Sequence, residues 1–266
     1  MYPEPRLVRV DDRVLTVEDT GPADGFPVLV HSGHGSRHVA PAAAREARDA
    51  GLRLIGYDRP AYGGSTPRPG RSLADCAPDV EAVLRELDLE RIAVWGFSAG
   101  GPYALATAAL LPKAVAAVCL FASPGPYGVP GFDFLDGLAD TDREDVHVFF
   151  TDRAAARERF RRDSTELYDR AFTPGADDEA AHHLASVYRD GWTHGDDGRW
   201  DDWSAFLRPW GIDFGDIIAP VGLWHGDMPA HSRWLASQIP HSTTHHSESE
   251  DNDRRRAHTW IRDQLA

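Results

Sequence analysis

Short apolar runs separated by longer, helix-like stretches recur along the chain. The runs at residues 28–30, 52–57, 92–95, 115–121 and 221–224 are short and apolar, and each ends near a Gly, Ser or His. Buried parallel strands are near-continuous apolar runs, and they need long crossover connections, which are usually helices. The pattern therefore predicts an α/β fold with a mostly parallel central sheet flanked by helices.

Two further features support this layout. Residues 6–10 and 14–19 alternate in polarity and are joined by a three-residue polar link, which favours an antiparallel hairpin. Ser72 is a good N-cap for a helix that reaches Leu87. Apolar side chains recur in that segment at helical spacing and predict a face packed on the sheet: Leu73, Val80, Val83, Leu84 and Leu87.

The regular alternation stops between about residues 124 and 213. This stretch has scattered aromatic residues, an Arg- and Asp-rich middle and no clear strand. It predicts a helical lid inserted into a core formed by residues 1–123 and 214–266. Loops at the carboxyl edge of an open α/β sheet carry substrate sites, so a lid there would cover a site. A solvated helical appendage without a role in binding is the alternative.

The composition of the chain limits the classes of binding partner that it can have. Among 266 residues, 28 are basic and 42 are acidic, which gives a formal charge of −14 and disfavours nucleic acid and anionic membranes as partners. No apolar run approaches the roughly 20 residues of a membrane-spanning helix, and the first 19 residues are too polar for a signal peptide. We expect a cytoplasmic protein with a small-molecule substrate. The sequence does not decide between a monomer and a homodimer. The two cysteines, Cys76 and Cys119, form neither a disulfide framework nor a metal motif.

One motif carries chemistry. Residues 96–100 read Gly-Phe-Ser-Ala-Gly, directly after the predicted strand 92–95 and before a helical run. A G-x-S-x-G pattern in this strand–turn–helix context places the serine on a sharp, strained turn, where only small residues fit on either side. Ser98 is then an exposed nucleophile. The helix that begins behind it supplies unpaired N–H groups for an oxyanion, the Ala99 N–H among them.

With this motif the chain resembles the α/β-hydrolase fold superfamily. Residues 31–37 resemble the family's oxyanion loop, H-G-x-P-G-S, and residues 56–65 its D-R-P-G-Y-G-x-S turn. Residues 202–240, with Trp-His-Gly-Asp at 224–227, resemble the end of the lid and the acid-bearing strand. The resemblance implies Ser98 as nucleophile, the Gly33 N–H as second oxyanion donor and Asp227 as the acid that orients a histidine.

The family's histidine does not align. Without gaps, Asp251 and Asn252 stand where its Gly-His pair is expected, and an amide cannot act as a base. The stretch 239–252 is too polar to be a good strand, so a shifted register could turn His245 or His246 towards Ser98; we favour His246. The third candidate is His34, which replaces the proline of the oxyanion loop and could lean into the pocket.

Three functions remain open. The first is a serine hydrolase that acts on an ester, thioester or amide of a small apolar molecule through an acyl-enzyme. The second is a non-hydrolytic enzyme of the cyclase or lyase type in specialised metabolism, with an altered triad. The third is a ligand-binding protein without catalysis. We expect no cofactor and no metal, because His31, His34 and His38 lack a familiar ligand partner at familiar spacing.

Overall fold

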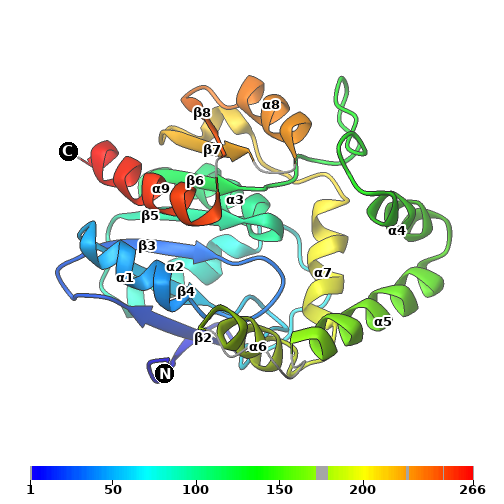
Figure 1. The fold of residues 1–266 in the computed structure, drawn as a ribbon, viewed down its shortest axis with the longest axis horizontal. Helices are drawn as coiled ribbons and strands as arrows, with labels where there is room; N and C mark the ends of the chain where they lie inside the picture. Colours follow the sequence, from blue (N-terminus) through cyan, green and yellow to red (C-terminus); the bar gives the residue numbers. More distant parts are fainter. Residues whose placement is uncertain (1, 172–178, 226–227, 248, 266) are drawn as a thin grey trace.

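A single sheet organises the molecule. The computed structural model describes residues 2–171, 179–225, 228–247 and 249–265. Within them, eight strands form one sheet in the order β1-β2-β4-β3-β5-β6-β7-β8 (Figure 1). The strands are β1 (Arg6–Val10), β2 (Arg13–Thr20), β3 (Phe26–His31), β4 (Leu52–Tyr57), β5 (Ile92–Phe97), β6 (Val115–Phe121), β7 (Val221–His225) and β8 (Ser242–His246).

The pairing is parallel except at one edge. β1 and β2 form the predicted antiparallel hairpin, and β2 pairs antiparallel with β4. All pairs from β4 to β8 are parallel. The α/β architecture with a mostly parallel central sheet is therefore confirmed, and the carboxyl ends of six strands meet along one edge.

Helices cover both faces of the sheet. Helices α1 (Pro41–Asp49) and α9 (Glu250–Leu265) lie together on one face (Figure 1). Helices α2 (Cys76–Glu86), α3 (Gly101–Leu110) and α8 (Pro229–Gln238) pack on the other. The predicted stripe of α2 is buried, but the helix begins at Cys76 rather than after Ser72. The Asp75 side chain accepts hydrogen bonds from the N–H and hydroxyl of Ser72 and holds that residue in a turn before the helix.

The last strand corrects one expectation. The polar stretch at residues 242–246 forms β8, which pairs with β7 at the edge of the sheet. We expected this stretch to be too polar for a good strand, and that was wrong. An edge strand has one neighbour, and three of the five residues here are exposed, so its stability does not require apolar side chains.

The stretch between β6 and β7 begins with non-helical residues 122–139 and is mainly helical after them in its described part. It contains α4 (Asp140–Thr151), α5 (Arg153–Ala171), α6 (Glu179–Gly191) and α7 (Asp197–Phe206). Figure 1 shows α4, α5 and α7 on the side towards which the arrow of β3 points, which is the carboxyl edge of the sheet. No helix in the described ranges is long and apolar enough to cross a membrane.

Close packing at Gly100 generates the first prediction. A Cβ atom at Gly100 would overlap the backbone carbonyl oxygen of His31, at the end of β3. Backbone cannot rotate away as a flexible side chain can, so Gly100→Ala should lower the free energy of unfolding by roughly 2–4 kcal/mol. Urea denaturation followed by circular dichroism measures the change.

The matched control is Gly128→Ala. Gly128 has φ +74°, and a Cβ atom there would have no neighbour within 4 Å, so an alanine meets only left-handed backbone strain of about 1–2 kcal/mol. Equal losses for the two variants would show that the contact with His31 does not restrict residue 100.

Candidate active site

Ser98 lies on a strained turn at the carboxyl end of β5. Its φ is +48°, in the left-handed region that residues other than glycine rarely adopt. The turn is crowded on both sides: a Cβ at Gly96 would come within 2.7 Å of the Ala104 Cβ, and one at Gly100 would overlap the His31 carbonyl. The chain enters α3 directly after it. The serine predicted from the motif therefore lies on a turn that only small neighbours permit.

Strand register brings Gly33 next to Ser98. β3 and β5 are parallel neighbours, with His31 beside Gly96, so the residues two positions further on meet beyond the strand ends. A Cβ at Gly33 would lie 3.6 Å from the Ser98 Cβ. The Gly33 loop and the Ala99 N–H at the start of the helical turn thus flank the serine. This is the arrangement expected for the two donors of an oxyanion hole.

Arg59 holds this loop in place by hydrogen bonds to its backbone. Its guanidinium donates to the carbonyl oxygens of Ser32 at 2.6 Å and of Gly33 at 2.7 Å. The same group donates to Asp202 Oδ2 at 2.7 Å, on α7. A single buried side chain therefore connects the loop of residues 31–37 with the inserted helices.

Asp202 is the centre of a buried polar cluster. Its carboxylate is fully buried and accepts hydrogen bonds from Arg59, from Arg71 at 2.5 Å, and from the hydroxyls of Tyr62 at 2.9 Å and Tyr103 at 2.8 Å. Burial alone would raise the pKa of this carboxyl. The charges of Arg59 and Arg71 outweigh burial and hold the pKa well below its usual range. Asp202 is therefore an anion at neutral pH.

His34 lies against the same carboxylate. Its Nδ1 atom is 3.1 Å from the Tyr62 hydroxyl oxygen and 3.6 Å from Asp202 Oδ2, and its side chain is 22% exposed. Burial lowers the pKa of the imidazole, although Asp202 counteracts part of the effect. The imidazole is therefore largely neutral near pH 7.

Sequence reasoning missed the roles of Arg59, Tyr62 and Asp202. Arg59 and Tyr62 lie inside the D-R-P-A-Y-G-G-S turn, and Asp202 begins the last segment of the resemblance, but no local pattern pairs them. The contact between Arg59 and Asp202 spans 143 positions. Only the packing of α7 on the core brings the two together.

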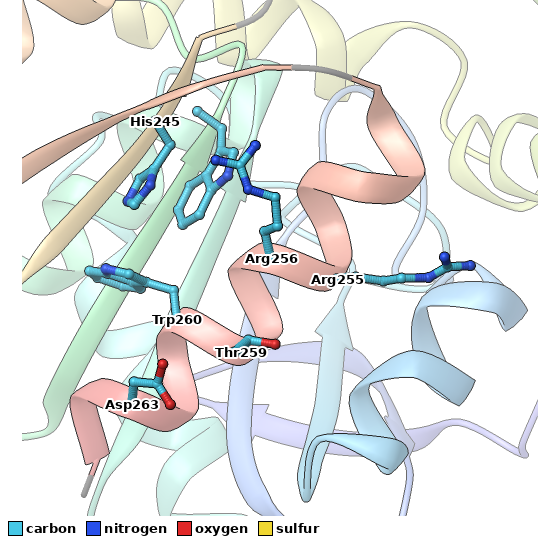
Figure 2. A pocket seen from close by; sticks show the side chains of 7 residues that line it. His245, Arg255, Arg256, Thr259, Trp260 and Asp263 are labelled. Carbon is cyan, nitrogen blue, oxygen red and sulfur yellow. The ribbon is translucent and has the colours of Figure 1, made fainter.

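The residues predicted as bases on β8 do not come next to Ser98. His246 is exposed at the end of β8, three strands from β5, and at about 4.8 Å per strand this is roughly 14 Å across the sheet. His245 stacks on Trp224, with ring centroids 4.1 Å apart, and lines a shallow pocket with Trp260 and Arg256 of α9 (Figure 2). That face of the sheet is opposite the one covered by α3. His245 thus packs on the face away from α3, and His246 as the partner of Ser98 stays a prediction.

Two further residues singled out in the sequence are Asp227 and Asn252. Asp227 lies outside the described residues. Asn252 lies in the first turn of α9, where its N–H donates to the Ser249 hydroxyl, so the segment after β8 enters a helix at this point. Across the part of the chain that the structure describes, no group of three His, Cys, Asp or Glu side chains is arranged to hold a metal ion.

Comparisons with known proteins agree with this geometry. Residues 27–228 match the alpha/beta hydrolase fold family. A curated relative, the dihydrolipoyllysine-residue acetyltransferase component of the acetoin cleaving system of Pseudomonas putida, is 34% identical over 131 residues. That match covers 46% of this chain, and the chain spans about a third, 34%, of the relative's length.

Solved structures share the fold over nearly the whole chain. A bromoperoxidase from Bacillus anthracis has a TM-score of 0.69 at 19% identity and covers 98% of both chains. A thermophilic esterase from Thermogutta terrifontis has a TM-score of 0.66 at 20% identity, over 99% of this chain and 98% of its own. The enol-lactonase from Burkholderia xenovorans LB400 has a TM-score of 0.68 at 16% identity, over 98% and 99%. At these identities the likeness shows the fold.

The Asp202 cluster generates the second prediction. Asp202→Asn keeps the shape of the side chain but leaves two buried guanidinium groups without this anion, so the free energy of unfolding at pH 7 should fall by about 3–5 kcal/mol. Urea denaturation measures it, with the exposed Asp12→Asn as the control, which should change little.

The pH dependence has a defined sign. A carboxyl whose pKa is depressed in the folded protein contributes stability above its unfolded pKa of about 3.9 and loses it as the pH falls through the folded value. The gap between parent and Asp202→Asn should persist from pH 7 to about pH 4 and narrow only below that. A gap that closes already between pH 7 and 5 would contradict the charged state of Asp202.

Proposed function

Because the chain belongs to the α/β-hydrolase fold family, we propose that it is a serine hydrolase that cleaves an ester, thioester or amide bond of a small apolar molecule through an acyl-enzyme. One observation carries this proposal. Ser98 stands at φ +48° on the turn between β5 and α3, with the Gly33 loop beside it. A strained backbone is retained where the surrounding structure holds it, and such positions cluster at active sites.

The arrangement fits acyl transfer. Attack of the Ser98 hydroxyl on a carbonyl carbon places negative charge on the carbonyl oxygen, which the N–H groups of Gly33 and Ala99 can stabilise without rearrangement. Arg59 limits movement of the loop that carries the first donor, because it binds the carbonyls of Ser32 and Gly33. Preorganised donors of this kind supply about 3–4 kcal/mol each in known cases.

An apolar substrate is supported by the residue before the nucleophile. Phe97 is 47% exposed, although it is large and apolar, and its ring would be 3.4 Å from a Cβ on Gly33. An apolar acyl or alcohol group placed at Ser98 would cover this ring and gain from its burial. Among the structural neighbours are proteins named as an esterase and an enol-lactonase, which adds support for this class of reaction.

The sequence prediction of Asp227 as acid rests on the resemblance, and that of His246 as base rests on a shifted register of residues 239–252. An observation favours the second candidate function, a non-hydrolytic enzyme or a binding protein: among the described residues, no imidazole is within hydrogen-bond distance of the Ser98 hydroxyl. Without a base Ser98 would be an ordinary alcohol. The two functions differ in whether the hydroxyl is activated.

A fluorophosphonate probe tests this difference. The parent protein should become labelled and should hydrolyse p-nitrophenyl butyrate, whereas Ser98→Ala should remain unlabelled and lose at least about 10³-fold in turnover. Its melting temperature should stay close to that of the parent, since only a partly exposed hydroxyl is removed. Intact-mass spectrometry and absorbance measure the two readouts.

Ser237→Ala is the matched control, because Ser237 is an exposed serine on α8 that bonds only within its own helix turn and to the Gln238 amide. It should label and turn over as the parent does. A parent protein that reacts neither with the probe nor with the ester would rule out the serine hydrolase and favour the second candidate.

A further inference from the structure

His34 belongs to the loop beside Ser98, where the proposed hydrolase needs a base. It follows Gly33, which is the loop residue beside Ser98, and it lies in the loop after β3, the strand adjacent to β5. Both Ser98 and His34 are partly exposed, so both side chains are accessible to a substrate. Each of the β8 histidines, in contrast, is three strands away from β5.

The hydrogen bonds of Tyr62 determine the tautomer of His34. Tyr62 has one hydroxyl proton, and it donates that proton to Asp202 Oδ2 at 2.9 Å. At the 3.1 Å contact with His34, the Tyr62 oxygen must therefore accept, and the His34 Nδ1 must donate. The proton of the neutral ring is on Nδ1, which also lies 3.6 Å from the Asp202 carboxylate. The lone pair of Nε2 is left free.

Asp202 is well suited to hold this ring. It is an anion fixed by Arg59, Arg71 and Tyr103, and it lies on the far side of the ring from Nε2. A buried carboxylate behind Nδ1 keeps an imidazole in the tautomer that can accept a proton at Nε2, and it stabilises the imidazolium once the proton arrives. Neither Ser98 Oγ nor His34 Nε2 has a hydrogen-bond partner among the described residues.

We propose that His34 is the general base of this enzyme and that Asp202 and Tyr62 are its positioning residues. The proposal rests on the serine hydrolase function and replaces the β8 histidine in it. As Ser98 Oγ bonds to the carbonyl carbon, its proton passes to His34 Nε2 through a bridging water. Nε2 then protonates the leaving alcohol, thiol or amine as the bond to it breaks.

The second half of the reaction returns the proton. Nε2 takes a proton from a water molecule, whose oxygen bonds to the acyl carbon. The bond from that carbon to Ser98 Oγ breaks, and Oγ recovers a proton from Nε2. The products are a carboxylic acid and the free enzyme, so no other reactant is required.

The charged surroundings are compatible with a base at neutral pH. The ring faces Asp202 of α7 and the Tyr62 hydroxyl. The positive charges of Arg59 and Arg199 also act on it and lower its pKa. Burial, first among these influences, lowers its pKa from the usual 6.5. The value of kcat/KM should therefore rise with pH through a pKa below 6.5 and stay level above it, because only the neutral imidazole accepts a proton.

The decisive variant is His34→Asn. The amide can still donate to Tyr62 but cannot accept a proton, so turnover of p-nitrophenyl butyrate should fall by about 10²–10⁴-fold. Added imidazole should restore part of the activity to this variant and none to Ser98→Ala. Rescue of this kind distinguishes a lost base from a disturbed fold. His147→Asn is the control, because His147 is exposed on α4, and it should match the parent.

Several results of these activity measurements would overturn the proposal. A His34→Asn variant with parent turnover, or one whose loss imidazole does not relieve, would remove His34 as base while the loss in Ser98→Ala keeps the hydrolase function. A loss in His246→Asn with none in His34→Asn would return the role to β8. A parent protein without probe labelling would overturn the hydrolase function and this base together, since Ser98 would then lack activation.

A readout independent of activity tests the positioning residues. Nitrogen-15 spectra of the imidazole groups should show the His34 ring with its proton on Nδ1 and a bare Nε2. In Tyr62→Phe the Nδ1–H loses its acceptor, so a second population with the proton on Nε2 should appear and turnover should fall together with it. A parent ring protonated on Nε2 when neutral would contradict the proposal, whatever the enzyme's turnover.

Discussion

The carboxylate of Asp202 is the group on which the candidate site depends. It is the common acceptor of two arginines and two tyrosines that come from distant parts of the chain. A single buried ion pair often contributes little to stability, because desolvation offsets the attraction between the charges. Here the cost is met by several charge-assisted hydrogen bonds to one anion, which leave neither carboxylate oxygen without a donor. The cluster determines how α7 lies on the core.

The consequence for the site is a loop beside Ser98 that is held by hydrogen bonds from Arg59. Arg59 can bind the carbonyls of Ser32 and Gly33 only because Asp202 holds the rest of its guanidinium. The backbone beside Ser98 is thus positioned by a charge on an inserted helix. The insertion also contacts the loop by main chain, since the Ser36 N–H donates to the Val187 carbonyl of α6. The inserted helices therefore support the backbone of the candidate site.

Sequence patterns predicted what depends on local chemistry. The apolar runs identified the central strands, and the Gly-x-Ser-x-Gly spacing identified the turn, because both are set by neighbouring residues. The Asp202 cluster was not predictable, since its contacts join residues up to 143 positions apart and follow from how helices pack. β8 was misjudged because the expectation of apolar strands applies to buried ones. The sequence raised His34 as a candidate, but only the structure shows that Tyr62 and Asp202 set its tautomer.

The ion pairs of this cluster also constrain how the chain can evolve. Arg59 and Arg71 balance Asp201 and Asp202, so the group is electrically neutral as a whole and charged at every member. Replacing Asp202, for example, leaves the buried Arg59 without its ion-pair partner, whereas replacing both members of that pair leaves neither charge unpaired. Substitutions at these positions are therefore strongly epistatic. Among distant relatives the four residues should be inherited or lost as a block, even though the sequence separates them into two widely spaced pairs.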